Sequence, residues 1–174
     1  MLKLRSLLGL PVLEIERGTR IGEVREVVLN VEQASVAGVV IAEPTWLSHE
    51  RGISFADLYG IGRDALTVRD ADAVRDFSAV LGGMGVYTLQ ALCDKQIYTE
   101  TGDYLGVVAD VACEQATGEI RFYELSDGFI TDFLRGRSVM PLPPVQVVGE
   151  GRLIVPEAMA KTLKAAINEP GGVV

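Results

Sequence analysis

The sequence predicts a mainly β protein, built as two small β-barrels in tandem with a short α-helix after each. Two observations lead to this fold class. The 174-residue chain repeats its own pattern, and each copy divides into short apolar stretches separated by turn residues. Stretches of this kind are typical of antiparallel strands. Closure into a barrel would hide the strand edges that so small a sheet otherwise exposes.

The repeat is clearest where glycines and valines recur at the same spacing. Residues 18–31 read GTRIGEVREVVLNV, and residues 102–115 read GDYLGVVADVACEQ. At an offset of 84 positions, the matched pairs are Gly18 with Gly102, Gly22 with Gly106, Val24 with Val108, and Val27 with Val111. At an offset of 85 positions, Leu4 and Leu7 match Leu89 and Leu92.

These matches predict two domains. The first covers residues 1–82 and the second residues 86–168, each consisting of a barrel and its trailing helix. The short linker Gly82-Gly-Met-Gly85 lies between them. Residues 169–174 are expected to form a flexible tail, since chain ends without packing contacts fray.

The expected strands follow the apolar stretches in order. In the first copy they are residues 12–15, 22–31, 36–42, 52–59 and 65–68. In the second copy they are residues 97–99, 105–113, 120–125, 138–148 and 153–155. Gly18 can supply a positive φ to the first turn. The stretch from Pro141 to Pro144 weakens the strand over 138–148, because proline cannot donate to a ladder.

A helical signal closes each copy. Residues 70–81 begin with Asp70 as a candidate N-cap and stop at two glycines. Residues 156–167 begin with Pro156 at a position that favours proline. Their apolar residues share one face at helical spacing, namely Met159, Leu163, Ala166 and Ile167.

Composition excludes several classes of function. The formal net charge of −8 disfavours phosphate-backbone binding, which depends on Lys and Arg. Cys93 and Cys113 form neither a C-x-x-C pair nor a disulfide framework, so we expect two buried thiols in a reducing compartment. The apolar N-terminal run breaks at Pro11, and no window reaches the length of a membrane span. A soluble, cytoplasmic protein is therefore expected.

The residue types needed for catalysis or metal binding are scarce. His49 follows Ser48 directly, and adjacent loop residues rarely face each other as nucleophile and base. Cys93, Cys113 and His49 lack the spacing of metal ligands. Four aspartates lie close together without the calcium-loop pattern, so we read them as helix caps and solvated side chains: Asp64, Asp70, Asp72 and Asp76. No catalytic residue, metal or cofactor is predicted, and we expect no enzymatic activity.

Two segments carry large apolar side chains where a polar connection is expected. Residues 45–47 and 127–134 occupy equivalent positions, between the third and fourth strands of their copies. Contiguous apolar side chains of this kind either cap a barrel end or form an exposed anchor for a partner. The candidate partner-binding residues are Trp46, Leu47, Phe129, Ile130, Phe133 and Leu134.

The repeated motif resembles the PRC-barrel domain, in two copies. In the first, Leu4-x-x-Leu7 is followed by Gly18-x-x-Ile21-Gly22-x-Val24-x-x-Val27 and Gly62-Arg-Asp-Ala-Leu-Thr-Val68. In the second, Leu89-x-x-Leu92 is followed by Gly102-x-x-Leu105-Gly106-x-Val108-x-x-Val111 and Gly149-Glu-Gly-Arg-Leu-Ile-Val155. The family includes the cytoplasmic part of the photosynthetic reaction-centre H subunit. It is also similar to the C-terminal barrel of a ribosome-maturation factor.

The resemblance implies a non-enzymatic adaptor or scaffold that binds a protein partner, with a homodimer as one option. Direct nucleic-acid binding is not expected, because basic residues are dispersed along the chain. Two alternatives remain open at this point. One is a small-molecule or cofactor-binding module linked to photosynthetic or redox electron transfer. The other is a ribosome or RNA-processing accessory that acts through a protein partner.

Overall fold

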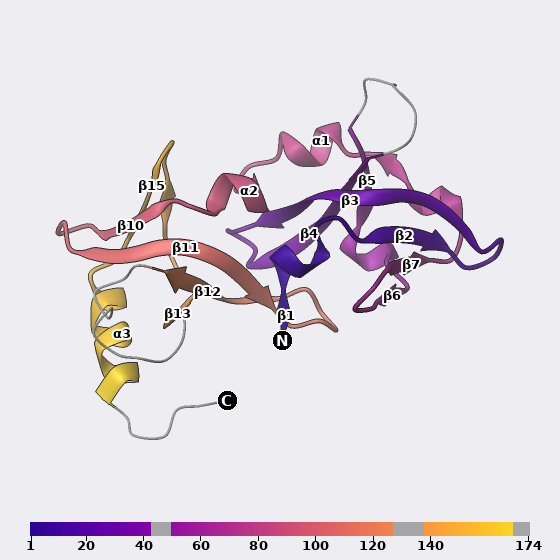
Figure 1. The fold of residues 1–174 in the computed structure, drawn as a ribbon. Helices are drawn as coiled ribbons and strands as arrows, with labels where there is room; N and C mark the ends of the chain where they lie inside the picture. The colour runs from indigo at the N-terminus through magenta and orange to yellow at the C-terminus, as the bar shows by residue number, and fades with distance from the viewer. Residues whose placement is uncertain (43–49, 127–137, 169–174) are drawn as a thin grey trace. The chain divides into compact units, whose positions relative to one another are not determined.

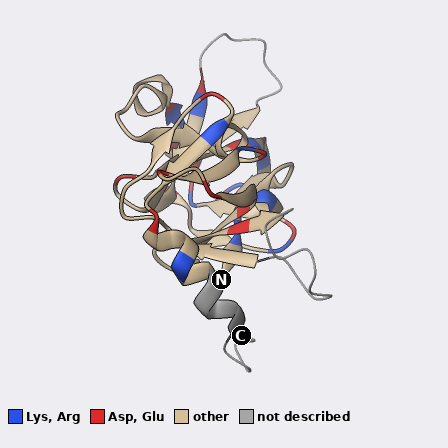
Figure 2. Cartoon of the chain, turned by 90° about the vertical axis from the view of Figure 1, so that its left-hand side faces the viewer, with Lys and Arg blue, Asp and Glu red and all other residues tan. Residues whose placement is uncertain are grey.

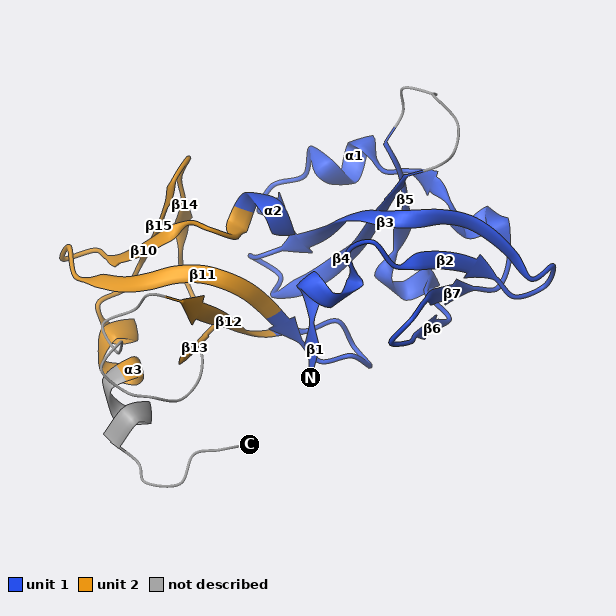
Figure 3. Cartoon of the chain, in the orientation of Figure 1, with its two compact units in different colours: residues 1–91, 112–120 blue, residues 92–111, 121–174 orange. Residues whose placement is uncertain are grey.

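The structure of the chain is a computed structural model that describes residues 1–42, 50–126 and 138–168, with side chains up to 163 (Figure 1). The described chain is mainly β. It divides into two compact units (Figure 3). Unit 1 consists of residues 1–91 and 112–120, and unit 2 of residues 92–111 and 121–174.

Unit 1 contains one sheet, in which the strand order is β6-β7-β2-β3-β4-β5-β8, with β9 also pairing with β3. Neighbours are antiparallel except for the parallel pair β2 and β7. The strands are β2 (Pro11–Glu14), β3 (Thr19–Asn30), β4 (Ser35–Ala42), β5 (Arg51–Ser54), β6 (Gly60–Ile61), β7 (Leu66–Val68), β8 (Arg75–Asp76) and β9 (Val86–Thr88).

The long strand β3 is the centre of this sheet. Its pairing with β4 shifts register between Val24 and Glu26, and again between Val28 and Leu29. Each shift interrupts the simple alternation of faces that period two predicts. Between the two shifts, Val27 and Val28 keep regular pairing with β4 and so point to opposite faces of the sheet. Both are fully buried, as is Leu29, so both faces of β3 are covered here.

The turn prediction at Gly18 is confirmed. Gly18 has a φ of 64°, and the equivalent Gly102 has a φ of 96°. Both values lie in the left-handed region, which glycine enters without steric cost. The two copies therefore use the same turn chemistry before their long strands.

The predicted helix over residues 70–81 is wrong. This segment forms the 3₁₀ turn η3 (Ala71–Ala73), then β8, then the single helical turn α1 (Ser78–Leu81). Asp70 accepts a hydrogen bond from the Asp72 N–H, which fits the predicted capping role. The chain then extends to pair with β5, and Phe77 packs in the core against Val28 and Val40. Burial of one aromatic ring outweighs the helical pattern of the segment.

Unit 2 contains most of a second sheet, in which the strand order is β13-β12-β11-β10-β15-β14. Its strands are β10 (Gln96–Thr99), β11 (Tyr104–Cys113), β12 (Ile120–Ser126), β13 (Ser138–Pro141), β14 (Val147–Val148) and β15 (Arg152–Val155). The last two residues of β11, the turn that follows and the first residue of β12 belong to unit 1, as residues 112–120. The single strand expected over 138–148 forms two short strands instead, β13 and β14. Pro143 and Pro144 lie between them, and proline cannot donate to a ladder.

The C-terminal helix prediction is confirmed as α3 (Ala158–Asn168). Met159 and Leu163 are buried, as the apolar stripe predicts. The helix begins two residues after Pro156, which ends the preceding extended segment.

The expectation of closed barrels is not met. Within the described residues, the outermost strands β6 and β8 of the first sheet do not pair with each other, nor do β13 and β14 of the second. Three of these four strands are only two residues long. Short edge strands offer too few backbone groups to complete a ladder, and they also resist unwanted pairing.

Four short elements at the starts of the two copies were not predicted. They are β1 (Leu2–Lys3) and the 3₁₀ turn η1 (Leu4–Leu7) in the first copy, and β9 and the helical turn α2 (Leu89–Leu92) in the second. Their repeated leucines are nearly inaccessible to solvent. Leu4, Leu7, Leu89 and Leu92 thus recur in the sequence because they are core residues. In the parts of the chain that the structure describes, no helix is both long and apolar enough to cross a membrane.

Candidate functional site

The predicted partner-binding residues lie outside the described residues. Trp46 and Leu47 fall in residues 43–49, and Phe129, Ile130, Phe133 and Leu134 fall in residues 127–137. Their role as partner anchors stays a prediction. His49 also lies in the first of these segments.

One concave site of the described chain is a groove in unit 1, with a volume of about 830 Å³. Three segments line it, and all of them belong to unit 1. They are residues 36–37 at the start of β4, residues 54–61 from the end of β5 to β6, and residues 114–117 from the β11–β12 turn. We call this site the docking groove.

A change of backbone direction after β5 forms one wall of the docking groove. The strand predicted over 52–59 ends at Ser54, where the side-chain oxygen accepts a hydrogen bond from the Asp57 N–H. This cap starts the 3₁₀ turn η2 (Phe55–Asp57). The turn displaces Phe55, Leu58 and Tyr59 from strand alternation and directs them to the groove.

Tyr59 is the most exposed aromatic side chain of the docking groove, at 59% of its full accessibility. Its backbone is fixed, since the Tyr59 N–H donates to the Thr67 carbonyl at 2.8 Å. The Arg69 guanidinium carbon lies 4.6 Å from the centre of the tyrosine ring. A cation at this distance is attracted to the ring face, which favours one orientation of the ring.

A second cavity of about 440 Å³ adjoins the docking groove and shares Ala56, Leu58 and Tyr59 with it. Its other lining residues are mostly charged, namely Asp57, Arg69, Asp70, Asp72 and Arg75. We call it the charged end of the groove. The combined site thus joins an apolar part to an ionic part through Tyr59.

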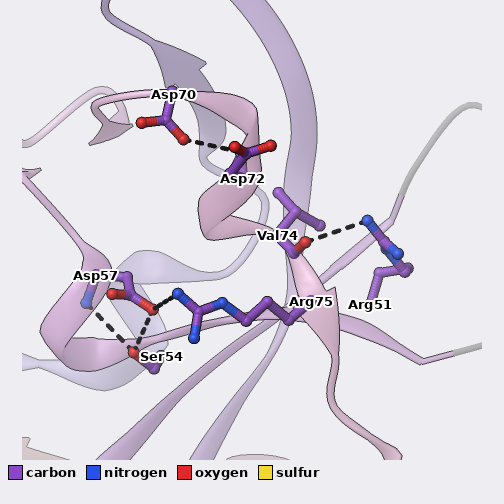
Figure 4. A network of polar contacts seen from close by, with 7 residues as sticks. All are labelled: Arg51, Ser54, Asp57, Asp70, Asp72, Val74 and Arg75. Atoms are coloured by element: carbon purple, nitrogen blue, oxygen red, sulfur yellow. Dashed lines mark hydrogen bonds and ion pairs between the residues drawn. The ribbon is translucent and has the colours of Figure 1, made fainter.

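Figure 4 shows the polar contacts at the charged end. One Asp57 oxygen accepts a hydrogen bond from the Ser54 hydroxyl at 2.9 Å and lies 3.5 Å from an Arg75 nitrogen. The Arg51 guanidinium donates to the Val74 carbonyl at 3.2 Å. These contacts tie β5, η2 and β8 together. They hold the wall of the groove in place without using the carboxylate of Asp72.

Gln115 closes the opposite wall. Its side-chain amide donates to the Ile61 carbonyl at 2.9 Å, which is a backbone acceptor of the edge strand β6. Gly118 lies against the ring of Phe55, so that a Cβ atom there would come within 2.8 Å of the ring. Residues 114–118 therefore form a fitted wall of the groove.

The site carries an excess of negative charge. Its lining includes four carboxylates, from Asp57, Asp70, Asp72 and Glu114, and two guanidinium groups, from Arg69 and Arg75. Elsewhere in the chain, basic and acidic residues are interspersed along the strands, helices and loops (Figure 2). The groove is thus suited to a ligand that is partly apolar and partly cationic.

Neither cysteine is part of a disulfide and both are buried, as the sequence predicts. Burial raises the pKa of the Cys113 thiol from 9.0 to about 11, and the nearby Glu114 carboxylate adds to this shift. A thiol with so high a pKa is protonated at neutral pH and is a poor nucleophile. Among the described residues, no group of three or more His, Cys, Asp or Glu side chains is placed to hold a metal ion.

Sequence reasoning missed the docking groove. It treated residues 52–59 as one strand and the nearby aspartates as caps and solvated groups. Phe55, Leu58 and Tyr59 are spaced by three and four residues, which fits a turn of helix better than a strand. That spacing is the signal that could have shown the turn. The contribution of residues 114–117 had no local signal, because they are distant in sequence.

Comparison with known proteins supports the repeat. The family model of the PRC-barrel domain matches the chain twice, over residues 1–75 and 84–159. No curated protein matches the chain. The two matches cover most of the sequence and agree with the repeated glycine and leucine motif. The chain therefore belongs to the PRC-barrel family and carries two copies of its domain in tandem.

Proposed function

We propose that this chain is a protein-interaction module without enzymatic activity, and that its docking groove binds an extended segment of a protein partner. The observation that carries the proposal is the exposure and position of the Tyr59 side chain. This side chain is largely exposed, oriented by Arg69, and placed between an apolar groove and a charged one. Exposed aromatic side chains in a concave site are typical energetic anchors of interfaces.

The chemistry of the groove defines the partner segment. Apolar contacts would come from Phe55, Leu58 and Tyr59, which favours a segment with one or two large apolar side chains. The excess of carboxylates favours Lys or Arg next to them. The net charge of −8 for the whole chain would also speed the approach of a basic partner. A cytoplasmic location, which two buried cysteines without a disulfide favour, belongs to the same proposal.

Selection from a library of random displayed peptides tests this function on the full chain. The expected peptides combine aromatic or aliphatic residues with Lys or Arg, and their affinity should fall as salt is raised. The variant Tyr59→Ser should weaken binding by about tenfold, which corresponds to about 1.4 kcal/mol. Met84→Ser is the matched control, because Met84 is 84% exposed and lies outside the groove lining.

Two results would count against the proposal. One is a selection that returns no peptide with reproducible binding to the full chain. The other is a set of peptides whose affinity is the same for the parent, Tyr59→Ser and Met84→Ser. Either result would show that the groove is not the binding surface.

A further inference from the structure

The strand pairings of unit 1 exchange equivalent segments between the two family copies. Near the N-terminus, β1 pairs with the end of β11, through Leu2 with Cys113 and Lys3 with Ala112. In the other direction, β9 pairs with β3, through Tyr87 with Leu29 and Thr88 with Val28. All of these residues belong to unit 1 (Figure 3).

The two pairings join equivalent residues of the two copies. The repeat offset of 84 relates Val28 to Ala112 and Leu29 to Cys113, and the offset of 85 relates Leu2 to Tyr87 and Lys3 to Thr88. The leading strand of each copy therefore pairs with the long strand of the other copy. β1 pairs with β11, and β9 pairs with β3, in the same register. Such reciprocity is the mark of an isologous contact, in which one surface patch meets a second example of itself.

The turns of the two long hairpins repeat this relation. Ser35 and Glu119, which are equivalent at the offset of 84, form an antiparallel bridge. The Val36 N–H donates to the Gly118 carbonyl and the Ile120 N–H donates to the Ala34 carbonyl, both at 2.8 Å. Exchanging each residue for its equivalent converts one of these hydrogen bonds into the other.

The backbone of the two turns is also alike. Ala34 has a φ of 52° and its equivalent Gly118 has a φ of 73°. A positive φ is uncommon for alanine and costs glycine nothing, so the two turns share one backbone conformation although their residues differ at this position. The local approximate twofold axis thus passes close to the bridge between Ser35 and Glu119.

We infer that each copy of the domain carries a self-complementary surface whose partner is another copy of the same domain. The surface consists of the leading strand, the end of the long strand and the hairpin turn. In this chain, the two copies fill each other's surface within unit 1. The surface shares the hairpin turn after β11 with the docking groove, whereas the residues of η2 that line the groove are not part of the exchanged pairing.

A disulfide tests the closed pairing in the full chain. The two hydrogen bonds that flank Ser35 and Glu119 define them as a non-hydrogen-bonded antiparallel pair, for which the Cα atoms lie about 4.5 Å apart. That separation is suitable for a disulfide. The double variant Ser35→Cys with Glu119→Cys should crosslink within one chain under mild oxidation and stay monomeric. The control Ser35→Cys with Met84→Cys should not crosslink.

A second variant tests self-complementarity. Gly118→Val places a side chain against Phe55 at a positive φ and should displace the second copy's turn. The exposed surface of the first copy should then bind the first copy of another chain, with the two Ser35 positions facing each other. Gly118→Val with Ser35→Cys should therefore form a disulfide-linked dimer in larger yield than Gly118→Val with Met84→Cys.

The results that overturn the inference are equally specific. Failure of the Ser35 and Glu119 cysteines to crosslink within the otherwise intact chain would remove the pairing itself. If Gly118→Val leaves Ser35→Cys with no more dimer than the Met84→Cys control, the surface is not self-complementary. Should Gly118→Val fail to fold, Gly118→Ala replaces it in the same comparison of Ser35→Cys with Met84→Cys, because a Cβ atom alone already comes within 2.8 Å of the Phe55 ring.

Discussion

At the scale of single residues, Phe77 organises the packing of unit 1. Its ring packs against Val28 and Val40 and fills space that two strands leave open. Gly52 on β5 gives that space, because a Cβ atom there would come within 2.5 Å of the ring and 2.8 Å of the Val39 carbonyl oxygen. One aromatic residue and one glycine thus determine how closely β8 and β5 approach.

Replacing Gly52 by alanine should therefore destabilise the protein. The added methyl group collides with both a ring and a backbone oxygen, and overpacking of this kind costs about 1–3 kcal/mol. Urea unfolding would measure the loss. Gly151→Ala is the control, since a Cβ atom there meets nothing within 4 Å. Equal stability of the two variants would contradict the packing described for Phe77.

Cys113 gives the protein a pH dependence in the alkaline range. Its folded pKa of about 11 lies above the ordinary value of 9.0. As the pH rises from 9 towards 11, the thiol ionises in the unfolded chain before it does so in the folded chain, and the free energy of unfolding falls. The stability of the parent should decline through this window relative to Cys113→Ala. Parallel pH profiles of the two proteins would exclude the burial that raises the pKa.

At the scale of elements, short turns decide where functional side chains point. Ser54 ends β5 and starts η2, which brings Phe55 and Tyr59 to the docking groove. Asp70 starts η3 in the same way and leads into β8. Caps of this kind are recognisable in a sequence. After Asp70, however, the structure depends on contacts with strands outside residues 70–81. β8 pairs with β5, and Phe77 packs against core residues of other strands, so the helix that the local pattern favours does not form.

The helix α3 is the opposite case, since its local pattern and its packing agree. Leu163 is buried on the apolar face, so Leu163→Ala should cost about 2–5 kcal/mol. Lys161→Ala, at an exposed position of the same helix, should change the free energy of unfolding by less than about 0.5 kcal/mol. Chemical unfolding of both variants makes the comparison. Similar small effects would show that α3 does not contribute to the core.

At the scale of the whole molecule, the sequence contained the tandem repeat and its turns, but not the exchange between copies. Equivalent residues at offsets of 84 and 85 predicted two PRC-barrel domains, and the family model confirms them. The pairing of residues 112–120 within unit 1 could not be predicted, because it depends on contacts between segments far apart in sequence. The docking groove needs three such segments. Its composition was therefore inaccessible to local patterns.

Hydrogen–deuterium exchange of the full chain, with and without a selected peptide, tests the central claim most directly. If the docking groove binds the partner, amide exchange should slow in residues 54–61 and 114–117, and Tyr59→Ser should reduce the effect at a peptide concentration near the Kd of the parent. Unit 2 also exposes apolar side chains, at Val139, Val145 and Val147. Slower exchange in residues 138–148, with no change in 54–61 or 114–117, would contradict the account and place the binding surface elsewhere.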